Sequence, residues 1–264
     1  MIKRFSLLLL SLSLLLASCS EYQKILKSND YELKYKSAVE YYQKKDFSRA
    51  QALFQELRSV FKGSARGEEV NYYYSYCVYY SGDILMAAYY FSQFTTTYPL
   101  SKHASECEYM AAYCLYLYSP DPTLDQTYTQ KAIDRMELFL THYPNTPRKD
   151  TINTLVNNLD LKLQEKHYNN AYLYYKLRHY RAAVVALNNV LTDYPDTPYR
   201  EKILYYILKS NYRYADNSVE SKKTKRYQDT IDSYFTLINE YPKTKYLKEA
   251  KSIYTQASQF VTKK

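Results

Sequence analysis

Cysteine, histidine and carboxylate side chains are the groups of this 264-residue chain that could perform chemistry. The spacing of the histidines matches no His-Glu-x-x-His motif, and no Cys-x-x-Cys pair occurs, so no metal site is predicted. Carboxylate pairs such as Glu68-Glu69 fall in helical patterns and are typical of solvated helix faces. With only 3 glycines, the chain also lacks the glycine-rich loops that bind phosphates. We therefore expect neither an enzyme nor a cofactor.

Three of the four cysteines are predicted to be structural. Cys107 and Cys114 are seven residues apart, which is about 10 Å along a helix, too far for a disulfide if that helix is intact. We interpret both, together with Cys77, as small buried hydrophobic side chains.

The fourth cysteine, Cys19, follows a segment that is typical of an export signal. A basic start at Lys3 and Arg4 precedes an apolar run that ends in Leu16-Ala17-Ser18-Cys19. That ending resembles the bacterial lipobox, in which the cysteine thiol receives a diacylglyceryl group before cleavage. Residues 1–18 are therefore predicted to be a lipoprotein signal peptide, and residues 19–32 a lipidated N-terminal tether. The alternative is an ordinary secretory signal followed by a chance cysteine.

Acyl chains such as palmitate on Cys19 would hold the mature protein on a membrane, since each buried CH₂ contributes about 0.8 kcal/mol. Ser20 replaces the Asp that retains lipoproteins at the inner membrane, and no acidic cluster follows. We therefore expect a lipid anchor on the periplasmic face of the outer membrane.

Tyrosine is the unusual residue of the composition, with 36 Tyr and no Trp. Its ring provides apolar contact area and its hydroxyl a hydrogen bond, so a concave tyrosine-rich face could accept the aromatic side chains of an unfolded strand. We predict such a substrate groove at a cluster on one helix, of which some members must belong to the core: Tyr72, Tyr73, Tyr76, Tyr79 and Tyr80. Packing alone is the alternative explanation.

A basic run in the C-terminal half is the second candidate binding surface. It comprises Lys222, Lys223, Lys225 and Arg226, in a predicted turn, and is followed by Lys243, Lys245, Lys248 and Lys251. Removing Lys3 and Arg4 leaves a charge of about +7, which in an exported protein suits an acidic protein domain or an anionic lipid surface rather than nucleic acid. A solvated turn and helix face is the alternative.

These residues are positioned by an internal repeat. Four Tyr-Pro dipeptides occur at Tyr98, Tyr143, Tyr194 and Tyr241, and a small residue stands eleven residues before each of them. A fifth copy lacks the proline. The small residues are Ala50, Ala87, Ala132, Ala183 and Thr230, and four residues later stand Phe54, Phe91, Met136, Leu187 and Tyr234. This is the pattern of the second helix of a tetratricopeptide repeat. The first helix shows small and apolar or aromatic positions too, at Ala38 and Tyr41, Ser75 and Val78, and Ala171 and Tyr174.

The pattern predicts an all-α, tetratricopeptide-like helix-pair solenoid with five repeats and a C-terminal helix. Repeats one to three occupy residues 33–145, and repeats four and five with the C-terminal helix occupy 146–264. We expect about eleven helices, including a long one through Leu155 and Tyr168 and a last one from Thr244 to Val261. Insertions at Ser119–Pro122 and Asn217–Thr224 disturb the register of repeats three and five.

A lipobox followed by five such repeats resembles the BamD family, the lipoprotein subunits of the outer-membrane β-barrel assembly machinery. The closest local likeness is Ala171 to Thr197. The resemblance implies a non-enzymatic scaffold whose C-terminal repeats bind the periplasmic domains of the barrel subunit BamA, and whose N-terminal repeats receive unfolded outer-membrane β-barrel proteins.

One departure concerns the BamA contact. Family members use an arginine eight residues before the Tyr of repeat four, where this chain has Ala186. Other residues must then make the contact. The alternative function is that of another lipid-anchored repeat lipoprotein, in nutrient uptake or cell-envelope coordination. Sugar-binding members of that class usually need Trp platforms and large loop insertions, and this chain has neither.

Overall fold

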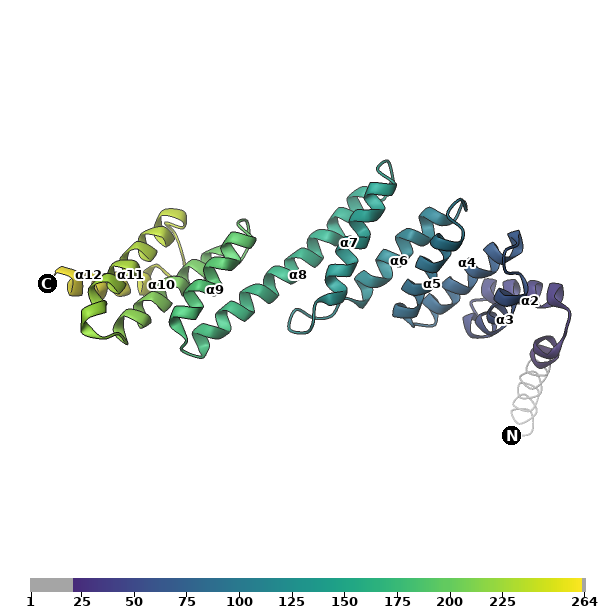
Figure 1. Ribbon diagram of the computed structural model, residues 1–264, viewed down its shortest axis with the longest axis horizontal. Helices are drawn as coiled ribbons and strands as arrows, with labels where there is room; N and C mark the ends of the chain where they lie inside the picture. The colour runs from purple at the N-terminus through teal and green to yellow at the C-terminus, as the bar shows by residue number, and fades with distance from the viewer. Residues whose placement is uncertain (1–20, 263–264) are drawn as a thin grey trace, which may run out of the picture. The chain divides into compact units, whose positions relative to one another are not determined.

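The computed structural model describes residues 21–262, which are all-helical and contain no strand (Figure 1). Residues 21–27 are helical, and eleven further helices follow: α2 Tyr31–Gln43, α3 Phe47–Val60, α4 Ala65–Tyr80, α5 Ile84–Thr97, α6 Ala104–Tyr118, α7 Thr127–His142, α8 Lys149–Lys176, α9 Tyr180–Asp193, α10 Arg200–Asp216, α11 Glu220–Glu240 and α12 Leu247–Thr262. Consecutive helices pack against one another from α2 to α7 and from α9 to α12, as a tetratricopeptide-like solenoid requires. The predicted fold class, long helix and final helix are confirmed.

The small residues of the repeat lie at helix crossings. Ala50, Ala87, Ala132, Ala183 and Thr230 are completely buried, and the larger residue four positions later is buried in every copy. A small side chain allows two helices to approach closely, while the residue one turn on fills the space beside it. The register of the second helix of each repeat is confirmed. Tyr174, expected to pack in the first helix of repeat four, is instead exposed.

The Tyr-Pro dipeptides end helices, as predicted. Tyr98, Tyr194 and Tyr241 are the C-terminal caps of α5, α9 and α11, because the proline that follows has no N–H and cannot continue the helix. A hydroxyl residue two positions after each proline could cap the next helix by its residue type. It instead accepts a hydrogen bond from the backbone N–H two residues later, within the turn; these residues are Ser101, Thr146, Thr197 and Thr244.

The chain divides into two compact units, each with its own core. Unit 1 includes residues 21–119 and 127–156, and unit 2 includes residues 120–126 and 157–262. Phe54, Phe91 and Phe94 are among the largest side chains in the core of unit 1, and Tyr168, Leu187 and Ile203 have the same role in unit 2. Helix α8 contributes residues to both units.

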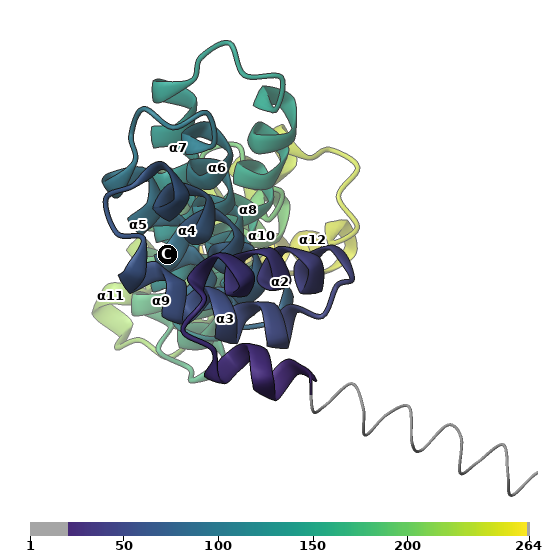
Figure 2. The same cartoon turned by 90° about the vertical axis from the view of Figure 1, so that its right-hand side faces the viewer.

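Part of the predicted tether is folded. Residues 21–27 form a helix beside α3 (Figure 2), and Tyr22, Ile25 and Leu26 pack against the core of unit 1. The ring of Tyr22 lies 5.7 Å from that of Tyr41. Cys19 and the predicted signal peptide lie outside the described residues. Among the helices of residues 21–262, none is long and apolar enough to cross a membrane.

The two insertions have different structures. Residues 119–126 form a non-helical connection between α6 and α7. Most of the second insertion is helical, because α11 begins at Glu220. The basic run therefore lies in the first two turns of a 21-residue helix and not in a turn between helices, which corrects the expectation.

Candidate partner-binding surfaces

The first helix of several repeats presents a row of tyrosines. On α6, the rings of Tyr109, Tyr113 and Tyr116 stack in sequence at 5.7 and 6.0 Å. On α8, Tyr168, Tyr172 and Tyr175 stack in the same way at 5.8 and 5.9 Å. Residues at positions i, i+4 and i+7 share one face of a helix. The rings of each row therefore pack as a continuous stack, in which Tyr168 is buried and the other members are half-buried.

The predicted substrate groove is only partly a surface. Tyr76 is 8% exposed, and its hydroxyl donates a hydrogen bond of 2.8 Å to Glu106 Oε1, so its ring is unavailable to a ligand. Tyr73 stacks on the buried Phe54 at 5.6 Å. Of the five predicted residues, Tyr76 is therefore buried, whereas Tyr73 is half-buried against Phe54.

The other three predicted groove residues retain exposed area. Tyr72 is half-buried and stacks on His103 at 4.1 Å. Tyr79 is half-buried, and Tyr80 is 50% exposed and stacks on Phe47 at 4.3 Å. A ligand could contact these rings, which would contribute area without losing much conformational entropy because each is already held by a neighbour.

An ion pair fixes this tyrosine surface in unit 1. Arg148 Nη2 donates to Glu106 Oε2 at 2.7 Å, and the guanidinium lies 4.3 Å from the ring centroid of Tyr109. Burial and the hydrogen bond to Glu106 raise the pKa of Tyr76, so its hydroxyl remains a proton donor. The Glu106 carboxylate of α6 accepts hydrogen bonds from Tyr76 of α4 and from Arg148, and it therefore links α4 to α6.

The basic run divides into two free and two engaged cations. Lys222 and Lys225 are exposed. Lys223 lies 3.4 Å from Glu220 and near the ring of Phe260. Arg226 stacks on Tyr214, with 3.9 Å between the guanidinium carbon and the ring centroid, and also bonds to Ser218. Only Lys222 and Lys225 are therefore unengaged cations of this run, and the lysines at 243, 245, 248 and 251 are exposed as well.

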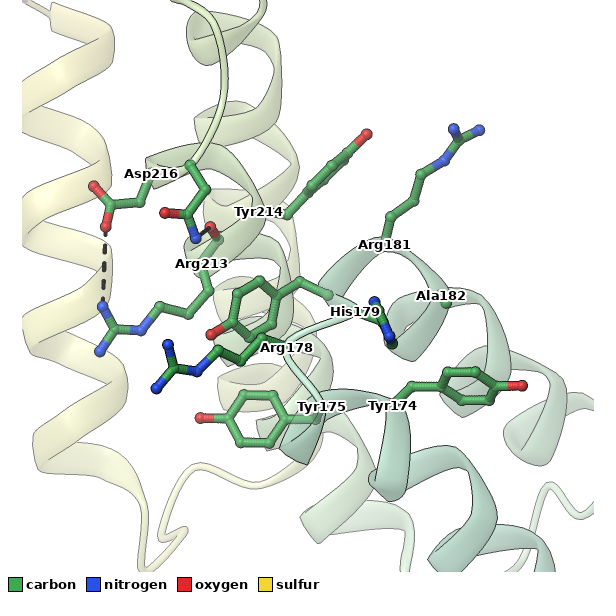
Figure 3. A pocket seen from close by; sticks show the side chains of 11 residues that line it. Tyr174, Tyr175, Arg178, His179, Arg181, Ala182, Arg213, Tyr214 and Asp216 are labelled. Atoms are coloured by element: carbon green, nitrogen blue, oxygen red, sulfur yellow. Dashed lines mark hydrogen bonds and ion pairs between the residues drawn. The ribbon is translucent and has the colours of Figure 1, made fainter.

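A cleft of about 950 Å³ lies in unit 2 where the turn between α8 and α9 meets the end of α10. We call it the arginine cleft, because Arg178, Arg181 and Arg213 line it, with Tyr174, Tyr175, His179, Tyr180, Ala182, Tyr214, Asp216 and Asn217. Figure 3 shows the side chains of Arg178 and Tyr175 extending toward the side where Arg213 lies, while those of Arg181 and Tyr214 point away from that side. The nearest Arg213 and Asp216 atoms are 3.9 Å apart.

The backbone of the α8–α9 turn explains how Arg178 enters the cleft. Its φ of 63° is left-handed, a conformation that Gly82 adopts in the turn between α4 and α5 and Lys45 in that between α2 and α3. For a residue with a side chain this costs about 1 kcal/mol or more. The residue that follows the left-handed position also differs. Asp46 and Asp83 cap α3 and α5 by accepting hydrogen bonds from the backbone N–H groups of Arg49 and Met86. The His179 side chain makes no such capping hydrogen bond for α9.

A second hollow lies in unit 1. Two adjoining depressions between α5, α6 and α7 share Ser92, Ala111 and Arg135. Exposed apolar side chains line them, at Met86, Tyr89 and Leu138. The sequence interpretation did not predict this hollow, because its residues come from three helices of two repeats, α5, α6 and α7, and share no local motif.

The tyrosine rows and the arginine cleft were also missed by the sequence interpretation, although one signal was present. Tyr35, Tyr72 and Tyr109 recur at intervals of 37 residues, as do Tyr168 and Tyr205. An alignment of the chain on these tyrosines would have predicted the register of the first helix of each repeat and the face of that helix that carries the tyrosines. No group of His, Cys, Asp and Glu that could hold a metal occurs within residues 21–262.

A sequence model of the family YfiO, described as outer membrane lipoprotein, matches residues 28–226. That range contains α2 to α10, the tyrosine rows, the arginine cleft and the basic run. No curated protein matches the chain.

Proposed function

Because the chain belongs to the YfiO family of outer membrane lipoproteins, we propose that it is a BamD-type scaffold of the machinery that assembles β-barrel proteins in the outer membrane. The observation that carries this proposal is the family match over residues 28–226, on a chain whose helix pairs present separate aromatic and basic surfaces. The protein would act by binding, without catalysis, and would be held on the periplasmic face of the membrane by lipid on Cys19.

Unit 1 would receive unfolded barrel proteins. The strands of such proteins expose alternating aromatic side chains, and the half-exposed rings of Tyr72, Tyr79 and Tyr80 offer edge and face contacts to them. The neighbouring stack of Tyr109, Tyr113 and Tyr116 extends the aromatic area on α6. Because these rings are already packed, binding would order few additional side chains.

Unit 2 would bind the periplasmic domains of BamA. The exposed Lys222 and Lys225, with the lysines of α12 and its approach, would attract an acidic domain. Such a surface increases the association rate more than it tightens the complex, and its effect decreases with salt because the Debye length is about 8 Å at physiological ionic strength.

Purification of the protein from cross-linked outer membranes, followed by mass spectrometry, tests the proposal. We expect the barrel subunit and unfolded barrel proteins among the cross-linked partners. Cross-links only to sugar-uptake or cell-wall proteins would instead favour another lipid-anchored repeat lipoprotein.

The basic run permits a sharper test. Lys222→Glu with Lys225→Glu should slow association with BamA and weaken its salt dependence, while leaving the Lys223 and Arg226 contacts intact. Lys62→Glu with Lys102→Glu, at exposed positions of unit 1, is the matched control. Equal association rates for both double variants would place the docking surface elsewhere.

A further inference from the structure

We propose that the arginine cleft of unit 2 is a binding site for an acidic peptide segment that carries apolar residues beside its carboxylates. Three arginine residues line the cleft against one carboxylate, although the Arg181 side chain points away from the side where Arg213 lies. That carboxylate, Asp216, is shared between Arg213 at 3.9 Å and the Tyr227 hydroxyl at 3.5 Å. This site adjoins the basic run, because Arg226 packs on Tyr214 of the cleft, but it does not include Lys222 or Lys225, and its occupancy does not require the barrel-assembly role.

Two of the three arginines are available to a ligand. Arg178 and Arg181 are both exposed, and in the part of the chain that the structure describes neither lies within 4.0 Å of a carboxylate oxygen. A guanidinium group can donate two parallel hydrogen bonds to a carboxylate. A peptide carboxylate would therefore find donors here that no intramolecular partner occupies.

The aromatic walls favour a peptide over a small anion. Tyr175 continues the stacked row of Tyr168 and Tyr172 and lies 5.9 Å from the ring of Tyr180. Tyr214 is held on one face by the guanidinium of Arg226 at 3.9 Å. A volume of about 950 Å³ is far larger than an inorganic ion needs, whereas apolar side chains next to Asp or Glu would cover these rings.

The α8–α9 turn of repeat four is more positively charged than the equivalent turns of repeats one and two. Lys45 has the same left-handed backbone as Arg178, but Asp46 follows it and pairs with Arg49 at 3.0 Å. In the α4–α5 turn, Gly82 and Asp83 occupy the two positions. At the α8–α9 turn the chain has Arg178 and His179. His179 stands where the other two turns have an aspartate, so no carboxylate at this position neutralises the cleft. The favourable side-chain cap at the start of α9 is absent as well.

Selection of a random peptide library against the full-length lipidated protein in detergent tests this site. We expect enrichment of peptides that combine Asp or Glu with apolar residues. Fluorescence anisotropy should show the best peptide binding at least about tenfold more weakly to Arg178→Gly, since one charge-assisted pair is lost. This substitution relieves the left-handed strain, so the variant should unfold at the same temperature as the wild type or higher, which separates loss of binding from loss of fold.

Lys45→Gly is the matched control, because it relieves the same backbone conformation in unit 1 and should leave peptide affinity unchanged. Equal loss of affinity in both glycine variants, or selected peptides without acidic enrichment, would overturn the proposal. Full displacement of the peptide by millimolar inorganic phosphate would show a simple anion site, and Arg178-dependent binding of phosphatidylglycerol vesicles without peptide selection would show a lipid-facing surface. Either result would also contradict a peptide site.

Discussion

Tyrosine serves this protein as a core residue that can also make polar contacts across helices. The hydroxyls of Tyr76 and Tyr205 reach Glu106 and Glu249 on neighbouring helices. Burial, and then the hydrogen bond to Glu249, raise the pKa of Tyr205 to about 12. The ring therefore contributes apolar burial while the proton stays on the oxygen as a donor.

The interaction of Glu249 with Lys209 and Tyr205 predicts a pH-dependent contribution to stability. Hydrogen bonds from Lys209, at 2.8 Å, and from Tyr205 hold the pKa of Glu249 below its ordinary value. A carboxylate with a lowered pKa stabilises the fold above its unfolded pKa, about 4.3, and this stability is lost as pH falls through the folded value. Glu249→Gln should lower the free energy of unfolding at pH 7 by about 0.2–1 kcal/mol, because the carboxylate is half-exposed.

Urea titrations of the wild type and Glu249→Gln from pH 7 to pH 3 measure this effect. The difference between them should shrink below about pH 4.3 and disappear in acid. A difference that stays constant over the whole range would show that Glu249 contributes through packing and not through its charge.

The three described cysteines should be unreactive in the folded protein. Cys77, Cys107 and Cys114 are buried and free, and burial raises the pKa of Cys77 and of Cys114 to about 12. Thiol reagents attack the thiolate, so we expect no alkylation by iodoacetamide at pH 8 without denaturant and alkylation of all three in guanidinium. Ser221→Cys, at an exposed position, is the positive control and should label in the folded protein. Native labelling of the buried thiols at the control's rate would contradict their burial.

The helix pair is the element that determines stability, and each pair depends on a small residue at its crossing. Ala183 is completely buried on α9 with Leu187 one turn later. Ala183→Leu should overpack this crossing and cost about 1–3 kcal/mol. Ala182→Leu adds the same atoms on the exposed side of the same helix and should change stability little.

Thermal unfolding of the two variants compares these effects directly. Ala50→Leu and Ala87→Leu, at the corresponding positions of unit 1, should resemble Ala183→Leu because they share its burial. Unfolding temperatures equal to that of the wild type for all three would mean that these crossings accommodate a larger side chain.

At the scale of the whole molecule, the predicted lipid on Cys19 would link both units to a membrane. The family match and the sequence Leu16-Ala17-Ser18-Cys19 together predict that Cys19 carries the lipid. Cys19→Ala should abolish incorporation of a radiolabelled fatty acid and release the protein from the outer-membrane fraction. Cys77→Ala is the control and should keep both. Label retained by Cys19→Ala would exclude this attachment site.

The sequence by itself determined the helix pairs, their crossing residues and their ends, because these depend on local spacing. An alanine at a fixed distance before Tyr-Pro specifies both a close approach and a stop within one helix. The presence of only 3 glycines likewise argued against glycine-rich phosphate-binding loops, and the lipobox predicted a lipoprotein, without any tertiary information.

Only the tertiary structure decided which side chains of these helices are available. Tyr72 and Tyr76 are one turn apart, yet Tyr76 is buried against Glu106 of α6 while Tyr72 remains half-exposed, and no local pattern separates them. The arginine cleft joins Arg178 of the α8–α9 turn with Arg213 of α10, and the engagement of Lys223 and Arg226 depends on Phe260 and Tyr214. Such contacts depend on how neighbouring helices pack, and spacing within one helix does not determine them.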